Sequence, residues 1–222
     1  MRNYIKEKVE NTTKNFSSGK IEVLELDTLP DNINLAAILK TLETNFPSHY
    51  FHDLRAIKIQ HDDEFDRRGV NAVYRDQVLQ ITNRQENNKD LMDDIVHEFA
   101  HHMETLFPEA IYSDESLINE FLKKRSELKF ELQSEGYWVN EYDFDKLKFD
   151  ESFDIFLYKR VGRNMLRMVT TGLFIRPYGA VSIREYFATG FEAYYLGRRD
   201  ALEKISPMLY DKINELHHYQ VY

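Results

Sequence analysis

The stretch HEFAH contains two histidines four residues apart, His97 and His101, and a glutamate, Glu98, directly after the first. In an α-helix, positions i and i+4 lie on one face, so both imidazoles can point at one metal ion. Glu98 would lie beside that face, where its carboxylate can reach a water molecule on the metal without binding the metal. Such a short pattern also arises by chance, but the order His-Glu-x-x-His predicts a catalytic zinc site.

A catalytic zinc ion normally has three protein ligands, so a third ligand must lie elsewhere in the chain. The metzincin pattern requires glycine at position 104 and histidine at position 107, but the chain has Glu104 and Phe107 there, which excludes that class. His102 and Glu104 lie on the same helix as the two candidate ligands. We expect both side chains to point away from the metal, into solvent or a partly buried position.

Two glutamates remain as candidates for the third ligand. Glu120 lies in INEF, which resembles the Asn-Glu ligand motif of aminopeptidase and thermolysin-like gluzincins, although the charged LKKRSELKFE that follows is typical of an exposed helix. Glu185 lies in the apolar segment EYFATGFEAYYL, where a buried carboxylate is costly unless a cation such as zinc accompanies it. Ser182, three residues earlier, offers a simpler role for Glu185 in a capping box.

The elements that would position these residues follow from hydrophobic spacing. The helix that carries HEFAH should run from Leu91 to about Leu106, with Asp90 as its N-cap and a buried apolar stripe. Strands are predicted over residues 54–60 and 71–82, as a hairpin or as neighbours. Further helices are predicted over residues 33–46, 115–133 (ending near Gly136) and 152–169. Two more helices should begin after Ser182 and after Ser206. Residues 137–150 have no clear period and are predicted to be a connector. The sum is an α+β fold, with helices around a small sheet.

Composition narrows the class of function. The formal net charge is −9 over 222 residues, and no basic run exceeds the three residues at 123–125, which disfavours nucleic acid and membrane partners. The chain has no cysteine, so His, Asp or Glu must hold any metal. A polar arm over residues 1–20 lacks the apolar core of a signal peptide. We therefore expect a cytoplasmic protein if Met1 is the natural start, and a secreted one if a leader was removed.

Three pieces of the chain resemble the catalytic domain of the anthrax lethal factor-like zinc metallopeptidases: HEFAH at 97–101, YGAVSIREYFATGF at 178–191 and ALEKISPMLYDKINEL at 201–216. The family's second piece has Tyr-Gly, a glutamate seven positions after the tyrosine, two aromatics, an alanine and a later phenylalanine. This chain has every one of them: Tyr178, Gly179, Glu185, Tyr186, Phe187, Ala188 and Phe191. The likeness runs from about Leu54 to Gln220. The bacterial Mlc titration factor family is also similar but fits less well around Tyr178.

The resemblance implies a zincin-like fold in which a small mixed sheet and an active-site helix precede a mostly helical C-terminal half. It implies that His97, His101 and Glu185 hold Zn²⁺, that Glu98 is the base, and that Tyr178 donates a hydrogen bond in the transition state. We expect one zincin-like domain over 1–222. The segment between His101 and Glu185 is longer than the family usually has, so we expect an insertion within 107–175.

The function expected from these residues is a zinc-dependent endopeptidase that hydrolyses peptide bonds of a protein or peptide substrate. An extended substrate could add as a strand to a sheet edge near residues 71–82. One alternative is a catalytically silent metallopeptidase-like binding protein, although the candidate ligands, base and tyrosine are all present. Another is an aminopeptidase with Glu120 as the third ligand. Nothing in the sequence indicates an oligomeric state.

Overall fold

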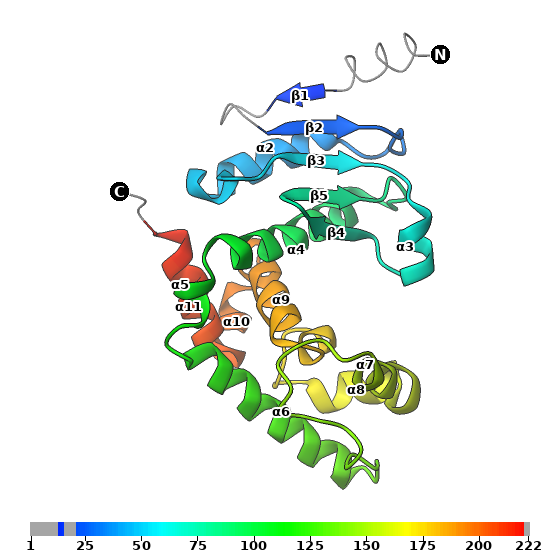
Figure 1. The fold of residues 1–222 in the computed structure, drawn as a ribbon, viewed down its shortest axis with the longest axis vertical. Helices are drawn as coiled ribbons and strands as arrows, with labels where there is room; N and C mark the ends of the chain where they lie inside the picture. The colour runs from blue at the N-terminus through cyan, green and yellow to red at the C-terminus, as the bar shows by residue number, and fades with distance from the viewer. Residues whose placement is uncertain (1–12, 16–20, 220–222) are drawn as a thin grey trace. The chain divides into compact units, whose positions relative to one another are not determined.

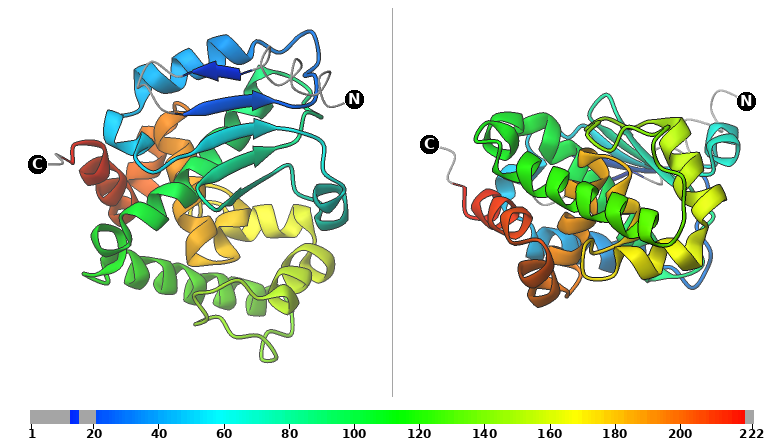
Figure 2. Two further views of the ribbon diagram at one scale, coloured as in Figure 1. Left: turned by 45° about the horizontal axis from the view of Figure 1, so that its top comes forward. Right: turned by 90° about the horizontal axis from the view of Figure 1, so that it is seen from below.

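The computed structural model describes residues 13–15 and 21–219, which fall into two compact units (Figure 1, Figure 2). The first unit takes the chain up to Leu106, and the second runs from Phe107 to Tyr219. The polar arm predicted over 1–20 lies outside the described residues except at 13–15. The single domain predicted over 1–222, with its insertion in 107–175, stays a prediction, because compactness alone does not define which segments fold together.

Within the described residues, the first unit contains a five-stranded mixed sheet in the order β1-β2-β3-β5-β4. The strands are β1 (Thr13–Asn15), β2 (Glu22–Glu25), β3 (Ala56–Ile59), β4 (Ala72–Arg75) and β5 (Val78–Ile81). The β2–β3 and β3–β5 pairs are parallel, whereas β1–β2 and β4–β5 are antiparallel. The α+β class and the small mixed sheet are confirmed, and β4 lies at an edge of the sheet.

The strand predicted over residues 71–82 is wrong in one respect, because it is a hairpin of two strands. Asp76 and Gln77 form its turn with φ of 52° and 63°, the left-handed conformation that two-residue hairpin turns require. Turns of this kind usually contain Asn-Gly or Asp-Gly, so the dipeptide Asp-Gln did not lead us to predict a turn here. The predicted hairpin between 54–60 and 71–82 is also wrong, since β3 pairs in parallel with β5; the alternative, that the two are neighbours, is confirmed.

In the described part of the first unit, four segments are helical: α2 (Leu35–Asn45), the 3₁₀ turn η1 (Ser48–Phe51), α3 (Asp63–Arg68) and α4 (Asn88–Leu106). The helix predicted over 33–46 is confirmed by α2, whose Asn34 cap accepts from the Ala37 amide at 3.0 Å. Helices α2 and α4 lie on the same side of the sheet (Figure 2). No helix in the described ranges has both the length and the apolarity needed to cross a bilayer.

Helix α4 carries HEFAH, as predicted, and is anchored by an apolar stripe. Leu91, Ile95, Phe99 and Met103 are fully buried, while Leu106 at the end of the helix is half-buried. Burial of a large apolar side chain contributes about 1.5–3 kcal/mol each, so the stripe fixes the rotation of the helix about its axis. The predicted N-cap is wrong: the Asn87 side chain, not Asp90, accepts from the first amides, including that of Asp90.

The second unit is helical. Its elements are α5 (Pro108–Tyr112), α6 (Ser116–Ser134), α7 (Glu151–Ile155), the π-helical turn η2 (Phe156–Val161), α8 (Arg163–Thr170), the 3₁₀ turn η3 (Pro177–Ala180), α9 (Ile183–Tyr195), α10 (Arg199–Ile205) and α11 (Pro207–His217). Helix α6 and the connector at 137–150 agree with the predictions. The single helix predicted over 152–169 is interrupted, because Gly162 at φ 84° separates the π-helical turn from α8.

A buried arginine ties α6 to the segment that begins α9. Arg125 is 1% exposed, and its guanidinium donates to the carbonyl oxygens of Ala180 at 2.7 Å, Val181 at 3.3 Å and Asp143 at 3.0 Å. Its Cζ lies 3.9 Å from the ring centroid of Phe153, in cation–π contact. Burial lowers the pKa of Arg125 to about 10, so the side chain keeps its charge at neutral pH.

Candidate metal centre

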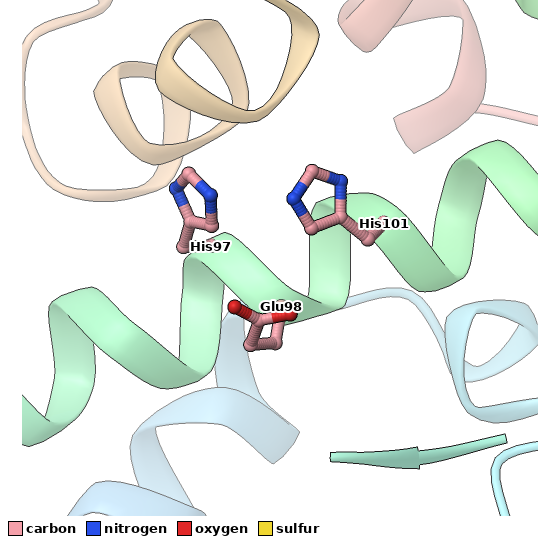
Figure 3. A group of neighbouring side chains, drawn as sticks. All are labelled: His97, Glu98 and His101. Carbon is pink, nitrogen blue, oxygen red and sulfur yellow. The ribbon is translucent and has the colours of Figure 1, made fainter. Parts of the chain in front are cut away.

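The structure brings the two histidines of HEFAH together, as the sequence predicts. His97 and His101 project from the same side of α4 (Figure 3), and their ring centroids lie 4.9 Å apart. One potential ligand atom from each of His97, Glu98 and His101 lies within 4.8 Å of the other two. This spacing suits three groups around one small cation or a cation and its water.

Glu98 is buried, with 6% of its surface exposed. Its carboxylate leaves α4 at a different angle from the two rings (Figure 3), and its Oε2 accepts a hydrogen bond of 2.5 Å from the backbone N–H of Tyr74. A carboxylate held by a backbone amide has a fixed orientation, because the amide belongs to the sheet and not to a mobile side chain. Glu98 is therefore positioned by strand β4.

Glu104 is partly buried, which is one of the two predicted positions, but it contacts His101, which was not predicted. The His101 Nδ1 lies 2.9 Å from the Glu104 Oε2, and these side chains are only 8% and 11% exposed. Since a carboxylate accepts hydrogen bonds, Nδ1 carries the proton and Nε2 keeps the lone pair that a metal would use. Metal-binding histidines in proteins usually have such a carboxylate or carbonyl partner. The spacing of three residues from His101 was the available sequence signal for it.

Asp94 has the matching position before His97, also three residues away, and sequence reasoning missed it. Burial raises the pKa of Asp94 to about 6, while a hydrogen bond from Gln85 at 2.9 Å and the charge of His97 act in the opposite direction. Carboxylates thus accompany both histidines, in the spacing Asp-x-x-His-Glu-x-x-His-x-x-Glu.

His102 is fully buried, so the prediction of a solvated or partly buried side chain is wrong. Its Nδ1 lies 3.0 Å from the Tyr74 hydroxyl, and its Nε2 lies 2.9 Å from the His52 carbonyl oxygen. Burial lowers the pKa of His102 to about 4, against the raising effect of its backbone hydrogen bonds, so the ring is neutral at physiological pH. It points away from the candidate metal site, as expected, and into the core.

Glu185 lies in the first turn of α9, in the second unit. The Ser182 hydroxyl accepts from the Glu185 amide at 3.2 Å, so the predicted N-cap is confirmed. One carboxylate oxygen of Glu185 is buried. Asp154 and Tyr158, both within the predicted insertion, are close enough to interact electrostatically with Glu185, and these two neighbours were not predicted.

Tyr178 lies in the 3₁₀ turn η3, in the same unit as Glu185, and is 37% exposed. Its ring centroid is 6.4 Å from that of Tyr158. The next residue, Gly179, lies against α9, where an added Cβ would stand 2.7 Å from the Thr189 Oγ1. Glycine therefore allows η3 to pack closely on α9.

Glu120, the rival third ligand, has a structural role within the second unit. Its carboxylate accepts from the amides of Met208 at 2.9 Å and Leu209 at 3.2 Å, and from the Tyr186 hydroxyl at 2.7 Å. It thus caps the N-terminus of α11 in place of the Ser206 side chain, although Ser206 is at the N-cap position, as predicted. These hydrogen bonds account for Glu120 without a metal.

A second group in the described residues could also hold a cation, namely His61, Asp63 and Asp66. The guanidinium of Arg84 already lies there, with Nη1 2.9 Å from both oxygens of Asp66 and Nη2 3.2 Å from the His61 Nε2. This guanidinium pairs with Asp66, so a cation already occupies part of the group.

Comparison of the chain with models of protein families, with curated proteins and with solved structures finds no match.

Proposed function

We propose that this protein is a zinc-dependent endopeptidase that hydrolyses peptide bonds within a protein or peptide substrate. The single observation that carries the proposal is the group formed by His97, Glu98 and His101, in which Glu104 leaves the His101 Nε2 available as a ligand. The likeness of three sequence pieces to the lethal factor-like metallopeptidases supports the same reading.

The donor set suits zinc. Two neutral imidazoles with a carboxylate as third ligand form a common catalytic zinc site, and a chain without cysteine cannot offer thiolates. We take the third ligand to be Glu185, on the sequence pattern of its helix. A zinc ion held by these residues would supply a Lewis acid and a water molecule whose pKa is lowered to about 7.

In the proposed reaction, Glu98 acts as the general base and then as the acid. Its carboxylate takes a proton from the attacking water and delivers it to the leaving amine, and Tyr74 holds its Oε2 through this exchange. The Tyr178 hydroxyl would donate a hydrogen bond to the oxyanion that develops on the scissile carbonyl. Such a preorganised donor typically contributes about 3–4 kcal/mol to transition-state stabilisation.

The outer edge of β4 offers a surface for an extended substrate. Because β4 has a neighbour on one side only, a substrate strand could pair with its outward-facing backbone groups other than the Tyr74 N–H, which Glu98 holds, with side-chain pockets adding selectivity. Asp62 and Asp63 lie at the start of α3, between β3 and β4, and their charge would favour a basic substrate, whereas the neighbouring Glu64 is already paired with Arg75 at 3.1 Å.

The proposal is tested by elemental analysis of zinc per chain on wild type, His97→Ala, Glu185→Ala and Glu120→Ala. We expect about one zinc per chain in wild type, as for a three-ligand site, none in the first two variants and an unchanged content in Glu120→Ala. Loss of zinc in Glu120→Ala alone would favour an aminopeptidase site. A wild-type protein that binds no zinc from a zinc-supplemented buffer would favour a silent binding protein.

Cleavage is tested separately, with a library of quenched fluorescent peptides. Zinc-loaded wild type should cleave internal bonds, and Glu98→Gln should retain zinc but lose the activity, because only the proton carrier has been removed. A preparation that releases single N-terminal residues would contradict the endopeptidase assignment.

A further inference from the structure

A chain of hydrogen bonds in the first unit connects the core to Glu98. His52 lies at one end, followed by His102, the Tyr74 side chain, the Tyr74 backbone amide and Glu98. Its three hydrogen bonds are 2.9, 3.0 and 2.5 Å long. The chain crosses from helix α4 to strand β4 and back to α4, so it joins the two elements twice within a few residues.

The protonation of His102 follows from its partners. A carbonyl oxygen can only accept, so the His102 Nε2 must donate to the His52 carbonyl. In the neutral ring, Nδ1 is then an acceptor, and the Tyr74 hydroxyl donates to it at 3.0 Å. The two rings also lie in contact, with centroids 5.3 Å apart. Both polar atoms of a fully buried imidazole are thereby satisfied, and the Tyr74 side chain is fixed.

The Tyr74 amide is available to Glu98 because of the register of the hairpin. Thr82 donates to the Asn71 carbonyl across β4 and β5, so those two residues form a hydrogen-bonded pair. Such pairs alternate along an antiparallel ladder, which makes Tyr74, opposite Leu79, a non-hydrogen-bonded position. Its N–H therefore points away from β5, toward the outer edge of the sheet, and there it meets the Glu98 carboxylate.

We infer that His102 is a positioning residue for the candidate base: it fixes Tyr74 through its Nδ1, and the Tyr74 amide in turn orients Glu98. This inference rests on the proposed function, in which Glu98 transfers the proton. It assigns a role to the second histidine of the pair His101-His102, which the metal site itself does not use. The two adjacent histidines then serve the two halves of the site, His101 the metal and His102 the base.

Two substitutions at position 102 separate this role from a purely structural one. In His102→Asn, the amide oxygen takes the place of Nδ1 and can still accept from Tyr74, while the bond to His52 is lost. In His102→Gln, the amide nitrogen takes the place of Nε2 and keeps the His52 bond, while the Tyr74 bond is lost. Tyr74→Phe removes the hydroxyl alone. Tyr194→Phe, which removes a hydroxyl bonded to Asn214 in the second unit, is the matched control.

The first readout does not depend on activity. It is the NMR signal of the Tyr74 backbone amide in protein labelled with ¹⁵N-tyrosine. The signal is assigned by its absence from the spectrum of Tyr74→Phe. A short bond to a carboxylate should move this proton downfield in wild type, and Glu98→Ala should abolish the displacement. We expect His102→Gln to move the signal toward its position in Glu98→Ala, and His102→Asn and Tyr194→Phe to leave it near the wild-type position. A His102→Gln signal that coincides with wild type overturns the inference, whatever the zinc and protease assays show.

The second readout is kinetic, on a quenched fluorescent peptide that wild type cleaves. We expect kcat to fall about tenfold in His102→Gln and Tyr74→Phe, a size usual for residues that orient an active-site group, with KM and zinc content unchanged. His102→Asn should retain more of kcat than His102→Gln. Equal losses in both variants, or a loss that follows zinc content, would overturn the positioning role. Absence of any cleavage by wild type would count against the proposed function only, because the amide signal still decides the inference.

Discussion

Removal of the Glu104 carboxylate should weaken zinc binding by an amount that the structure allows us to estimate. The bond between the His101 Nδ1 and the Glu104 Oε2 is 2.9 Å long and almost shielded from solvent. Hydrogen bonds to charged groups in such places contribute about 1.5–3 kcal/mol, and each 1.4 kcal/mol changes a binding constant about tenfold. Glu104→Ala should therefore raise the Kd for zinc by about 10- to 100-fold.

A graded pair of variants makes this prediction specific. Glu104→Gln keeps a neutral acceptor for the Nδ1 proton, so its loss should be smaller, on the order of 1 kcal/mol, or about fivefold in Kd. The measurement is competition for zinc against a chromophoric chelator, with thermal denaturation to confirm that each variant is folded. Glu86, an exposed residue of the same unit, supplies the controls Glu86→Ala and Glu86→Gln, which change the net charge equally.

A Glu104→Ala variant that binds zinc as tightly as Glu86→Ala does would contradict this prediction. Equal losses of affinity in Glu104→Gln and Glu104→Ala would also contradict it, because the contribution would then not come from acceptance of the Nδ1 proton. In either case, Glu104 would be a buried polar residue without influence on the metal.

Three further outcomes are expected. Glu120→Ala should lower the free energy of unfolding by about 1–3 kcal/mol, measured by urea denaturation, because two amides of α11 and the Tyr186 hydroxyl lose their acceptor; a variant as stable as wild type would contradict the capping role. Gly179→Ala should destabilise the second unit by about 1–3 kcal/mol through its contact with Thr189, and Thr189→Ala in the same chain should recover part of the loss. The Lys212 side chain, with Ser116, lowers the pKa of Asp114 to about 2, so its stabilisation is present above the unfolded value of 3.8 and is lost as pH falls through 2. Acid titration of the free energy of unfolding should therefore show a smaller decline below pH 4 in Asp114→Asn than in wild type.

The sequence predicted well those features that depend on spacing along a single element. The helical period alone places His97 and His101 on one face of α4 and buries Leu91 and Ile95 on another, and the structure has both arrangements. The N-cap of α9, in which the Ser182 hydroxyl accepts from the Glu185 amide, is equally local. Local rules suffice here, because the contacts concerned join residues no more than four positions apart.

Features that depend on contacts between distant segments were predicted poorly. The carboxylate of Glu120 accepts hydrogen bonds from the amides of Met208 and Leu209, which lie 88 and 89 residues further along the chain. No rule based on sequence spacing predicts contacts at that separation. The Tyr74 amide reaches Glu98 only because the hairpin register turns it outward, and that register depends on a turn at Asp76 that the residue types do not reveal. The His101–Glu104 contact is different: it is local and was not predicted, although the helical spacing of three residues allows it.

The guanidinium of Arg125 has a consequence for how this protein can diverge. All three of its hydrogen-bond acceptors are main-chain carbonyl oxygens, at residues 143, 180 and 181, and every amino acid supplies such an oxygen. Any residue at those three positions supplies the acceptor, whereas lysine at 125 has no planar fork to serve three carbonyls at once. Ala180 and Val181 are buried and so restricted by packing, but Asp143 is exposed. When homologous sequences are collected, position 125 should therefore stay arginine while position 143 varies, so covariation between the two positions would miss their contact.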